Sequence, residues 1–391
     1  MSFLYDSIKN SDNNSAFGTA LTILERNNLH LGNAYLQLTP MCNLDCNMCY
    51  AKMTKNEVLK YGRPIMDFNN WKWYIDRIKE MGTAALSLTG GECMLHPDFK
   101  KIYTYAYDQG FLITIMTNGT IMNDGLFELF KNRPPACFSV TIYGSSYDTY
   151  EKTCHDGNAY YKAYRNVERL IDAAFFVSAK YTVVRENASD LLTVFRYFYD
   201  KGIRLKYQKS LFQYNKADAD TIQKEEVDDN VMREIQSQID RIIGVSSLKC
   251  LNDESYIRNY KQKKTRDSKS RPSIGIRCAA GKSICHIRWD GIMTPCVSFD
   301  AFTIDPRETG FIEAWRQMNQ WAISFPCIEE CDDCIHQIRC QECIAFHYND
   351  MGASNRVSPR LCWKRKYPKE AENIEKCLLD KGIILKEDVD G

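Results

Sequence analysis

Residues 38–50 read LTPMCNLDCNMCY, which puts Cys42, Cys46 and Cys49 on one short loop. The loop directly follows the first predicted strand, Ala34–Leu38. Three thiolates at this spacing can hold three irons of a [4Fe–4S] cluster, and the fourth iron is left open because no fourth cysteine stands near. A structural zinc site would need four ligands, and no histidine or further cysteine is placed to complete one. The loop therefore predicts an iron–sulfur site with one open position.

Strand and helix patterns alternate on the C-terminal side of this loop, up to residue 212. Short stretches rich in β-branched and aromatic residues predict strands at Ala34–Leu38, Ala85–Leu88, Leu112–Thr117, Phe138–Ile142, Ala179–Val184 and Arg204–Lys209. Apolar residues at helical spacing predict helices at Asp67–Met81, Ala163–Ala173 and Ala188–Asp200. Repeated β/α units imply parallel strands with right-handed crossovers. Six units are too few for a closed eight-stranded barrel, so we expect an α/β fold with an open, partial (β/α)6 barrel and a ligand at the C-terminal ends of its strands.

A second group of cysteines crowds the C-terminal third, where ten of the 17 fall between Cys278 and Cys377. Eight of them follow a regular order: Cys278, Cys285, Cys296, Cys331, Cys334, Cys340, Cys343 and Cys362. Asp290-Gly291 predicts a tight hairpin that brings Cys285 and Cys296 close, one on each arm. Tight Cys-x2-Cys loops are typical of metal sites, and eight cysteines exceed the needs of one zinc knuckle. The region therefore predicts a second, metal-binding domain.

Composition excludes several classes of protein. The 391 residues carry 51 Lys+Arg and 50 Asp+Glu, so the net charge of +1 gives no electrostatic footprint for nucleic acid or an anionic membrane. The hydrophobic fraction of 44% excludes a wholly disordered chain, and no apolar run reaches the roughly 18 residues of a membrane span. The N-terminal residues lack a signal-peptide pattern, so we expect a cytoplasmic protein whose cysteines serve metal or redox chemistry rather than disulfides.

The same patterns suggest how the chain is divided. We expect an N-terminal segment at 1–33, the partial barrel at 34–215, a helix and charged linker at 216–275, the cysteine-rich domain at 276–365 and a C-terminal helix or tail at 366–391. Within the linker, 216–243 predicts a polar helix and 257–272 a charged, exposed loop.

The Cys-x3-Cys-x2-Cys spacing followed by an aromatic residue, after the first strand of a β/α domain, resembles the radical S-adenosylmethionine (SAM) superfamily. The resemblance implies that the open iron chelates the amino and carboxylate groups of SAM. It also implies that an electron from the cluster cleaves SAM to methionine and a 5′-deoxyadenosyl radical, which abstracts a hydrogen atom from the substrate.

Two further segments are similar to the same family. Thr89-Gly90-Gly91-Glu92 follows the second strand and resembles the Gly-Gly-Glu stretch that contacts the SAM amino group. Thr141, on the fourth strand, stands where many members have a serine that touches SAM, and Tyr143 replaces their aspartate. Cofactor contacts are thus implied for Tyr50, Gly90, Gly91, Glu92, Asn118 and Thr141.

The C-terminal cysteines resemble the SPASM domain of radical SAM maturases, although Cys340-x2-Cys343 is one residue shorter than the family spacing. The resemblance implies one auxiliary [4Fe–4S] cluster on Cys278, Cys285, Cys296 and Cys343, and another on Cys331, Cys334, Cys340 and Cys362. The pattern does not require Cys285, and Cys327 is a rival ligand. With neither of them, the first auxiliary cluster has an open iron.

These resemblances imply three [4Fe–4S] clusters, SAM, and a reductant such as flavodoxin or ferredoxin. SPASM proteins mostly modify peptides or proteins by crosslinking or side-chain oxidation, which is the first hypothesis; a radical dehydrogenase of a small molecule is the alternative. A non-catalytic metal scaffold is disfavoured by the intact Gly90-Gly91-Glu92. Val297 stands where sulfatase maturases have an aspartate base, which argues against that subclass. Only 41 residues precede Cys42, too few for the leader-binding domain of many maturases. We therefore expect substrate recognition to be built otherwise or to come from a separate protein.

Several remaining residues are expected to have ordinary structural roles. Cys93 is predicted to pack behind its loop rather than to react. Cys137, Cys154, Cys250 and Cys377 are interpreted as bystanders, and His96 and His286 as packing or hydrogen-bonding residues. Arg185, at the end of the fifth strand, either pairs with the SAM carboxylate or lies at the surface.

Overall fold

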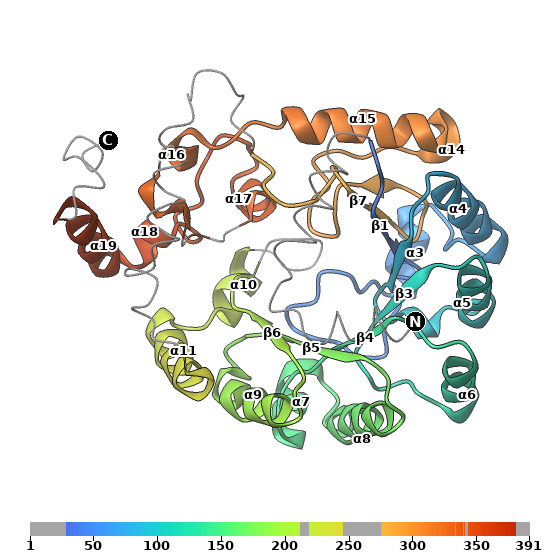
Figure 1. Ribbon diagram of the computed structural model, residues 1–391, viewed down its shortest axis with the longest axis horizontal. Helices are drawn as coiled ribbons and strands as arrows, with labels where there is room; N and C mark the ends of the chain where they lie inside the picture. The colour runs from blue at the N-terminus through green and yellow to red at the C-terminus, as the bar shows by residue number, and fades with distance from the viewer. Residues whose placement is uncertain are drawn as a thin grey trace.

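The computed structural model describes residues 29–211, 219–244, 275–332, 334–338, 340 and 343–380. Its centre is a curved sheet with the strand order β6-β5-β4-β3-β2-β1-β7-β8 (Figure 1). The strands are β1 (Asn33–Gln37), β2 (Ala85–Thr89), β3 (Leu112–Thr117), β4 (Cys137–Thr141), β5 (Val177–Thr182), β6 (Leu205–Gln208), β7 (Ile284–Ile287) and β8 (Met293–Thr294). The first six run parallel in chain order. The predicted open, partial barrel is confirmed.

Helices cover the outer face of this sheet (Figure 1). In the barrel region they are α3 (Lys55–Tyr61), α4 (Phe68–Glu80), α5 (Phe99–Asp108), α6 (Asp124–Asn132), α7 (Tyr147–Cys154), α8 (Asn158–Asp172), α9 (Leu191–Asp200), α10 (Ala219–Glu225) and α11 (Asp229–Ile243). The C-terminal part adds α14 (Pro306–Thr309), α15 (Phe311–Ser324), α16 (Glu329–Asp332), α17 (Ile344–Met351), α18 (Trp363–Lys366) and α19 (Pro368–Asp380). None of the helices in the described residues could cross a membrane.

Side-chain alternation gives the sheet two different faces. Leu36, Leu88 and Ile115 face outward, where they are fully buried against the helices and form the main core. The opposite face carries polar residues of the same strands, such as Ser87 and Ser139. The barrel therefore keeps its apolar core between sheet and helices, and its inner face can receive a polar ligand.

The predicted strands are confirmed to within two residues at each end. Two predicted helices start at other residues than expected. The helix predicted from Ala163 begins at Asn158, and the helix predicted from Ala188 is preceded by a 3-10 turn that ends at Asp190. The single helix expected at 216–243 is wrong: it is two helices, because the side chain of Asp228 caps α11 by accepting a hydrogen bond from the Asn230 backbone N–H. The charged loop expected at 257–272 lies outside the described residues.

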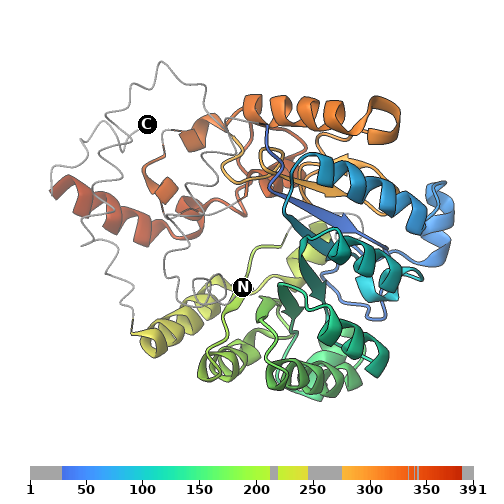
Figure 2. The same ribbon diagram turned by 45° about the vertical axis from the view of Figure 1, so that its right-hand side comes forward.

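The hairpin expected at Asp290-Gly291 is confirmed, since β7 and β8 pair antiparallel and Gly291 has a φ of 90°. A feature not expected from the sequence is that β7 also pairs parallel with β1. The cysteine-rich region is thus joined to the barrel by a continuous sheet. Figure 2 shows α16, α18 and α19 grouped on one side of the molecule, away from α5 and α6.

Candidate functional site

The cysteine loop starts where β1 ends and is fixed on one side by the segment after β2. The backbone N–H of Gly91 donates to the carbonyl of Thr39 at 2.8 Å, and the N–H of Glu92 donates to the carbonyl of Met41 at 2.9 Å. A Cβ on Gly91 would lie 2.4 Å from the Met41 oxygen, and one on Gly90 would lie 2.5 Å from the Thr39 oxygen. Only glycine permits this approach, so the glycine pair holds the cysteine loop in place.

The end of α7 fixes the other side of the loop. The N–H of Asp45 donates to the carbonyl of Cys154 at 3.1 Å, and the N–H of Asn47 donates to the carbonyl of Thr153 at 3.2 Å. The loop is therefore held by backbone hydrogen bonds from two barrel segments. Its geometry does not depend on flexible side chains alone.

The structure brings the three thiols together. The pKa of Cys42 is raised to about 12, mainly by burial and in smaller part by the neighbouring Cys46 and Cys49. Cys46 behaves differently: its pKa is lowered, first by a hydrogen bond from the Cys154 side chain and next by one from Tyr143, against the effect of burial. Backbone N–H groups of Leu44 and Lys52 donate to the sulfurs of Cys42 and Cys49 at 3.4 and 3.3 Å.

These donors suit a [4Fe–4S] cluster better than a single ion. Among the described residues, no three His, Cys, Asp or Glu side chains close around one point as ligands of one metal ion would. In a cluster the cysteine ligands are distributed over several irons, and N–H donors around the sulfurs stabilise their charge. Iron also supplies the positive charge that deprotonates buried thiols such as Cys42. The three cysteines therefore fit the cluster predicted for them.

Glu92 is fully buried, and its carboxylate is occupied by protein donors. It accepts hydrogen bonds from the Thr117 hydroxyl at 2.8 Å and from the backbone N–H groups of Asn118 at 2.9 Å and Met94 at 3.3 Å. Burial raises the pKa of Glu92, and these hydrogen bonds oppose that effect. The carboxylate thus ties the end of β2 to the end of β3, and its contact with the SAM amino group stays a prediction.

Asn118 links the end of β3 to the cysteine loop. Its amide nitrogen donates to the Asn43 side-chain oxygen at 3.1 Å and lies 3.7 Å from the Cys42 sulfur. Its side-chain oxygen accepts from the Thr120 hydroxyl at 2.7 Å. Thr141 ends β4 on the inner face, beside Lys180 of β5. The cofactor contacts implied for Asn118 and Thr141 remain predictions.

The C-terminal cysteines form two groups. The first contains Cys296, whose pKa is raised to about 12 by burial and then by the nearby Cys343 and Cys278. The second surrounds Cys331, whose pKa is raised to about 12 by burial and then by four cysteine neighbours, namely Cys327, Cys334, Cys340 and Cys362. The first group holds three of its four predicted members, without Cys285, and Cys327 lies with the second group rather than the first.

Cys285 is not brought to either group. It pairs with Ala34 across β1 and β7, and both residues belong to the buried core against the helices. Burial alone raises its pKa. Cys296 instead acts electrostatically on Tyr35, which faces the other side of the sheet, so the side chains of Cys285 and Cys296 take opposite faces of the hairpin. The pleat of the hairpin is the cause, because adjacent positions point to opposite faces.

Two residues at the cysteine loop were missed by the sequence analysis. The sequence interprets Cys154 as a bystander and Tyr143 only as a departure from a family pattern, yet both pack in one cluster with Cys46 beside the loop. Cys154 lies more than 100 residues from the loop in the sequence. The available signal is its place just before α8, the helix that leads from β4 to β5, because such crossover helices begin at the mouth of the barrel.

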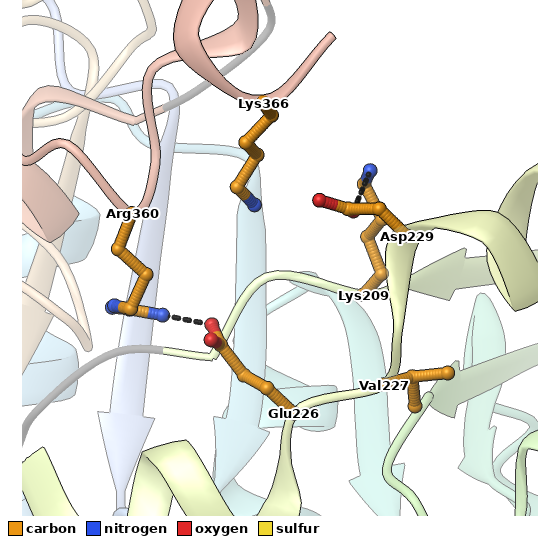
Figure 3. Close-up of a pocket in the computed structure, with 6 residues that line it drawn as sticks. All are labelled: Lys209, Glu226, Val227, Asp229, Arg360 and Lys366. Atoms are coloured by element: carbon orange, nitrogen blue, oxygen red, sulfur yellow. Dashed lines mark hydrogen bonds and ion pairs between the residues drawn. The ribbon is translucent and has the colours of Figure 1, made fainter.

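A separate cavity of about 260 Å³ lies between the barrel and the C-terminal segment (Figure 3). Its lining includes Lys209, Glu226, Asp229, Arg360 and Lys366. Lys209 pairs with Asp229 at 3.3 Å, and Arg360 pairs with Glu226. The first ion pair connects the end of β6 to the start of α11. The second connects the segment between α10 and α11 to the segment before α18.

Comparison with known proteins agrees with this geometry. Residues 36–198 match the Radical SAM superfamily. The chain is 38% identical to the S-adenosylmethionine-dependent nucleotide dehydratase of Selenomonas ruminantium over 27% of this chain and 34% of that protein. It is 24% identical to the subtilosin biosynthesis protein AlbA of Bacillus subtilis over 48% of this chain and 39% of AlbA. The chain thus spans well under half the length of these relatives.

Two AdoMet-dependent heme synthases are matched over most of their length. The AdoMet-dependent heme synthase of Nitratidesulfovibrio vulgaris is 22% identical over 84% of this chain and 91% of that protein. Among solved structures, native anSMEcpe with bound AdoMet and the Cp18Cys peptide has a TM-score of 0.61 at 14% identity, covering 90% of this chain and 98% of that one. Streptococcus suis SuiB bound to S-adenosylmethionine has a TM-score of 0.56 at 12% identity, covering 82% and 73%. At these identities, the structural likeness shows the fold alone.

Proposed function

We propose that this chain, which carries a radical SAM domain, reductively cleaves SAM and uses the resulting radical to modify a peptide or protein. The observation that carries this proposal is the cysteine loop held at the mouth of the barrel by Gly90, Gly91 and the end of α7. When bound there, the cluster supplies the electron that cleaves SAM to methionine and a 5′-deoxyadenosyl radical.

The chain's own residues would hold and orient the cofactors. Cys42, Cys46 and Cys49 bind three irons, and Gly90 and Gly91 fix the loop that carries them. In this proposal, Tyr50, Asn118 and Thr141 line the SAM site, and Glu92 keeps the ends of β2 and β3 together beside it. We assign electron delivery to a small reductant of the flavodoxin or ferredoxin type.

The two C-terminal cysteine groups support two auxiliary clusters. Cys278, Cys296 and Cys343 supply three ligands for the first, and Cys331, Cys334, Cys340 and Cys362 supply four for the second, with Cys327 nearby. Because Cys285 faces the core, we propose that a non-cysteine ligand or substrate completes the first cluster. Such clusters can accept an electron from the substrate or ligate a substrate thiolate.

A peptide substrate is favoured by the relatives that act on peptides. They include AlbA, named for subtilosin biosynthesis, and the sporulation killing factor maturation protein SkfB. SuiB has been solved with its precursor peptide SuiA, and it shares the fold of this chain. These likenesses support the substrate class and leave the bond that is formed open.

A small-molecule substrate is the second candidate, favoured by one specific observation. The heme synthase match covers nearly the whole of that relative, whereas the peptide-related sequence matches cover less than half of theirs. If this candidate is correct, the inner face of the barrel receives the small molecule directly.

The test starts with anaerobically reconstituted protein, reduced with dithionite and given SAM, with 5′-deoxyadenosine measured by chromatography. Short peptides encoded beside the gene are then added in one arm and iron coproporphyrin III in another. The proposal expects faster 5′-deoxyadenosine formation and a changed peptide mass in the first arm only. A product from the porphyrin alone would favour the second candidate, and no 5′-deoxyadenosine under any condition would contradict both.

A further inference from the structure

Lys180 and Lys206 are the only Lys, Arg, Asp or Glu residues in the described strands of the sheet. They lie side by side, because β5 and β6 pair parallel with Lys180 in register with Lys206. Their neighbours along the strands, Ala179 and Leu205, belong to the core between the sheet and the helices. Side chains alternate along a strand, so both lysines take the opposite, inner face of the barrel.

Nothing in the described part of the chain neutralises these two charges. Neither ammonium group forms an ion pair or a hydrogen bond with a described residue. Lys180 is half-buried, and its pKa is lowered first by burial and next by Lys206, so its surroundings disfavour the charge. Like charges side by side destabilise a sheet, and a partly buried charge is unfavourable without a partner. The pair thus opposes folding, which favours a role in binding.

Protection of the sheet edge explains only one of the two lysines. β6 ends the sheet, and an inward-pointing charge such as Lys206 hinders its pairing with a further strand. Lys180 lies on β5, which is already paired on both sides, with β4 and with β6. An edge role therefore leaves Lys180 unexplained, whereas an anion that both lysines contact accounts for the pair.

The pair lies on the far side of β4 from the cysteine loop. The loop follows β1, and four strand-to-strand steps separate β1 from β5 (Figure 1). At the usual strand spacing these steps amount to about 19 Å along the sheet. Lys180 is in register with Thr141, the last residue of β4 and one of the cofactor contacts implied by the family resemblance. In the proposed arrangement the pair therefore lies one strand beyond SAM.

We propose that Lys180 and Lys206 form a subsite for a carboxylate of the substrate, which holds the substrate on the inner face of the barrel beside SAM. The inference rests on the proposed function and deepens it, because it names a chemical group that the substrate carries. Two ammonium groups can both donate charge-assisted hydrogen bonds to one carboxylate, and its charge offsets the repulsion between them. In a peptide this carboxylate belongs to an Asp or Glu side chain or to the C-terminus; in the second candidate function it belongs to the small molecule.

The first experiment measures product formation by the reconstituted holoprotein against substrate concentration, in separate arms for the peptides encoded beside the gene and for iron coproporphyrin III. Lys180→Gln should raise KM about tenfold, the loss expected for one hydrogen bond to a charged group, with little change in kcat. Lys180→Arg should recover most of that loss, because it keeps the charge. Lys131→Gln is the matched control, since Lys131 pairs with Glu128 on the outer surface of α6 and should keep its KM.

The partner of the lysines is identified by changing the substrate as well. Conversion of the bound carboxylate to its amide should raise the KM of the wild-type protein by a similar factor. The same conversion should have little further effect on Lys180→Gln/Lys206→Gln, because the interaction is already lost. The arm in which this coupling appears shows whether a peptide or a small molecule carries the carboxylate.

The outcomes separate the inference from the proposed function. An unchanged KM in the double variant would overturn the inference and leave the proposed function intact. A loss of SAM affinity in Lys180→Gln as large as the loss of substrate affinity would assign this lysine to SAM, and would also overturn the inference. Absence of 5′-deoxyadenosine from the wild-type protein would instead overturn the proposed function.

Carboxylate binding can also be tested on the wild-type holoprotein without its natural substrate. The probe is acetyl-Gly-Glu-Gly-amide with a water-soluble carbodiimide, which joins the Glu carboxylate to a neighbouring amine as an amide and takes up the released water to become a urea. A neutral acetylating ester, N-hydroxysuccinimidyl acetate, measures the intrinsic reactivity of each lysine. Relative to that reactivity, mass mapping should find the probe about tenfold more on Lys180 or Lys206 than on Lys131. Equal relative labelling of the three lysines would overturn the inference.

Discussion

The cysteine loop at the barrel mouth and the C-terminal cysteine groups are built in different ways. The loop draws all three cysteines from residues 42–49 and is held by backbone hydrogen bonds from two barrel segments. The C-terminal groups collect cysteines from residues 278–362, and many of these lie between short helices such as α16 and α18. The comparison indicates that the barrel preforms the loop, whereas we expect the order of the second region to depend more on the clusters proposed for it.

The largest expected effect is on SAM cleavage, and it distinguishes a cysteine of the loop from a cysteine elsewhere in the barrel. Cys46→Ala should abolish 5′-deoxyadenosine formation from SAM, because the three-cysteine anchor is lost. Cys137→Ala is the control, since Cys137 lies at the start of β4 with its sulfur 3.5 Å from the Ser178 hydroxyl. Cleavage that persists in Cys46→Ala would show that another site carries the chemistry.

Removal of iron should affect the hydrogen exchange of the C-terminal region more than that of the barrel. After chelation of iron, hydrogen exchange measured by mass spectrometry should rise strongly in α17–α19 and little in β1–β4, because the barrel core is formed by apolar packing. Equal loss of protection in both regions would contradict the idea that the barrel preforms its loop.

Substitution of the two hairpin cysteines should affect the iron content of the protein differently. Cys296→Ala should lower the iron of reconstituted protein by about four per chain, the content of one cluster. Cys285→Ala should keep all of it, because this side chain faces the core of the barrel. Iron loss in Cys285→Ala that is equal to the loss in Cys296→Ala would restore Cys285 as a ligand.

The glycine anchor should have a smaller effect, on stability and position. Gly91→Ala places a methyl group 2.4 Å from the Met41 oxygen and should cost about 1–3 kcal/mol in urea unfolding, with weaker SAM cleavage. Gly125→Ala in α6 is the control, because its methyl would meet only the flexible end of Lys100 at 3.1 Å. If the two variants are equally stable and active, the close approach at Gly91 does not fix the loop.

The sequence predicts the barrel and the cysteine loop well for a physical reason. Strand patterns and a compact motif are local features, so the six strands and Cys42, Cys46 and Cys49 can be found without knowing the fold. Which face a strand residue takes depends on pairing, and the β1–β7 contact that turns Cys285 into the core joins segments some 250 residues apart. The packing of Cys154 and Tyr143 beside Cys46 likewise arises from tertiary contacts, because α7 and the segment after β4 lie far from the loop in the sequence.

The central claim is that the cysteine loop holds a cluster whose open iron binds SAM. The most direct test is the electron paramagnetic resonance spectrum of reduced, reconstituted protein before and after SAM is added. We expect SAM to change the signal of one cluster, and this change to be absent in the Cys42→Ala/Cys46→Ala/Cys49→Ala variant while the auxiliary signals remain. A spectrum that SAM leaves unaltered in the wild-type protein, or a SAM-dependent change that survives loss of the three cysteines, would contradict the claim.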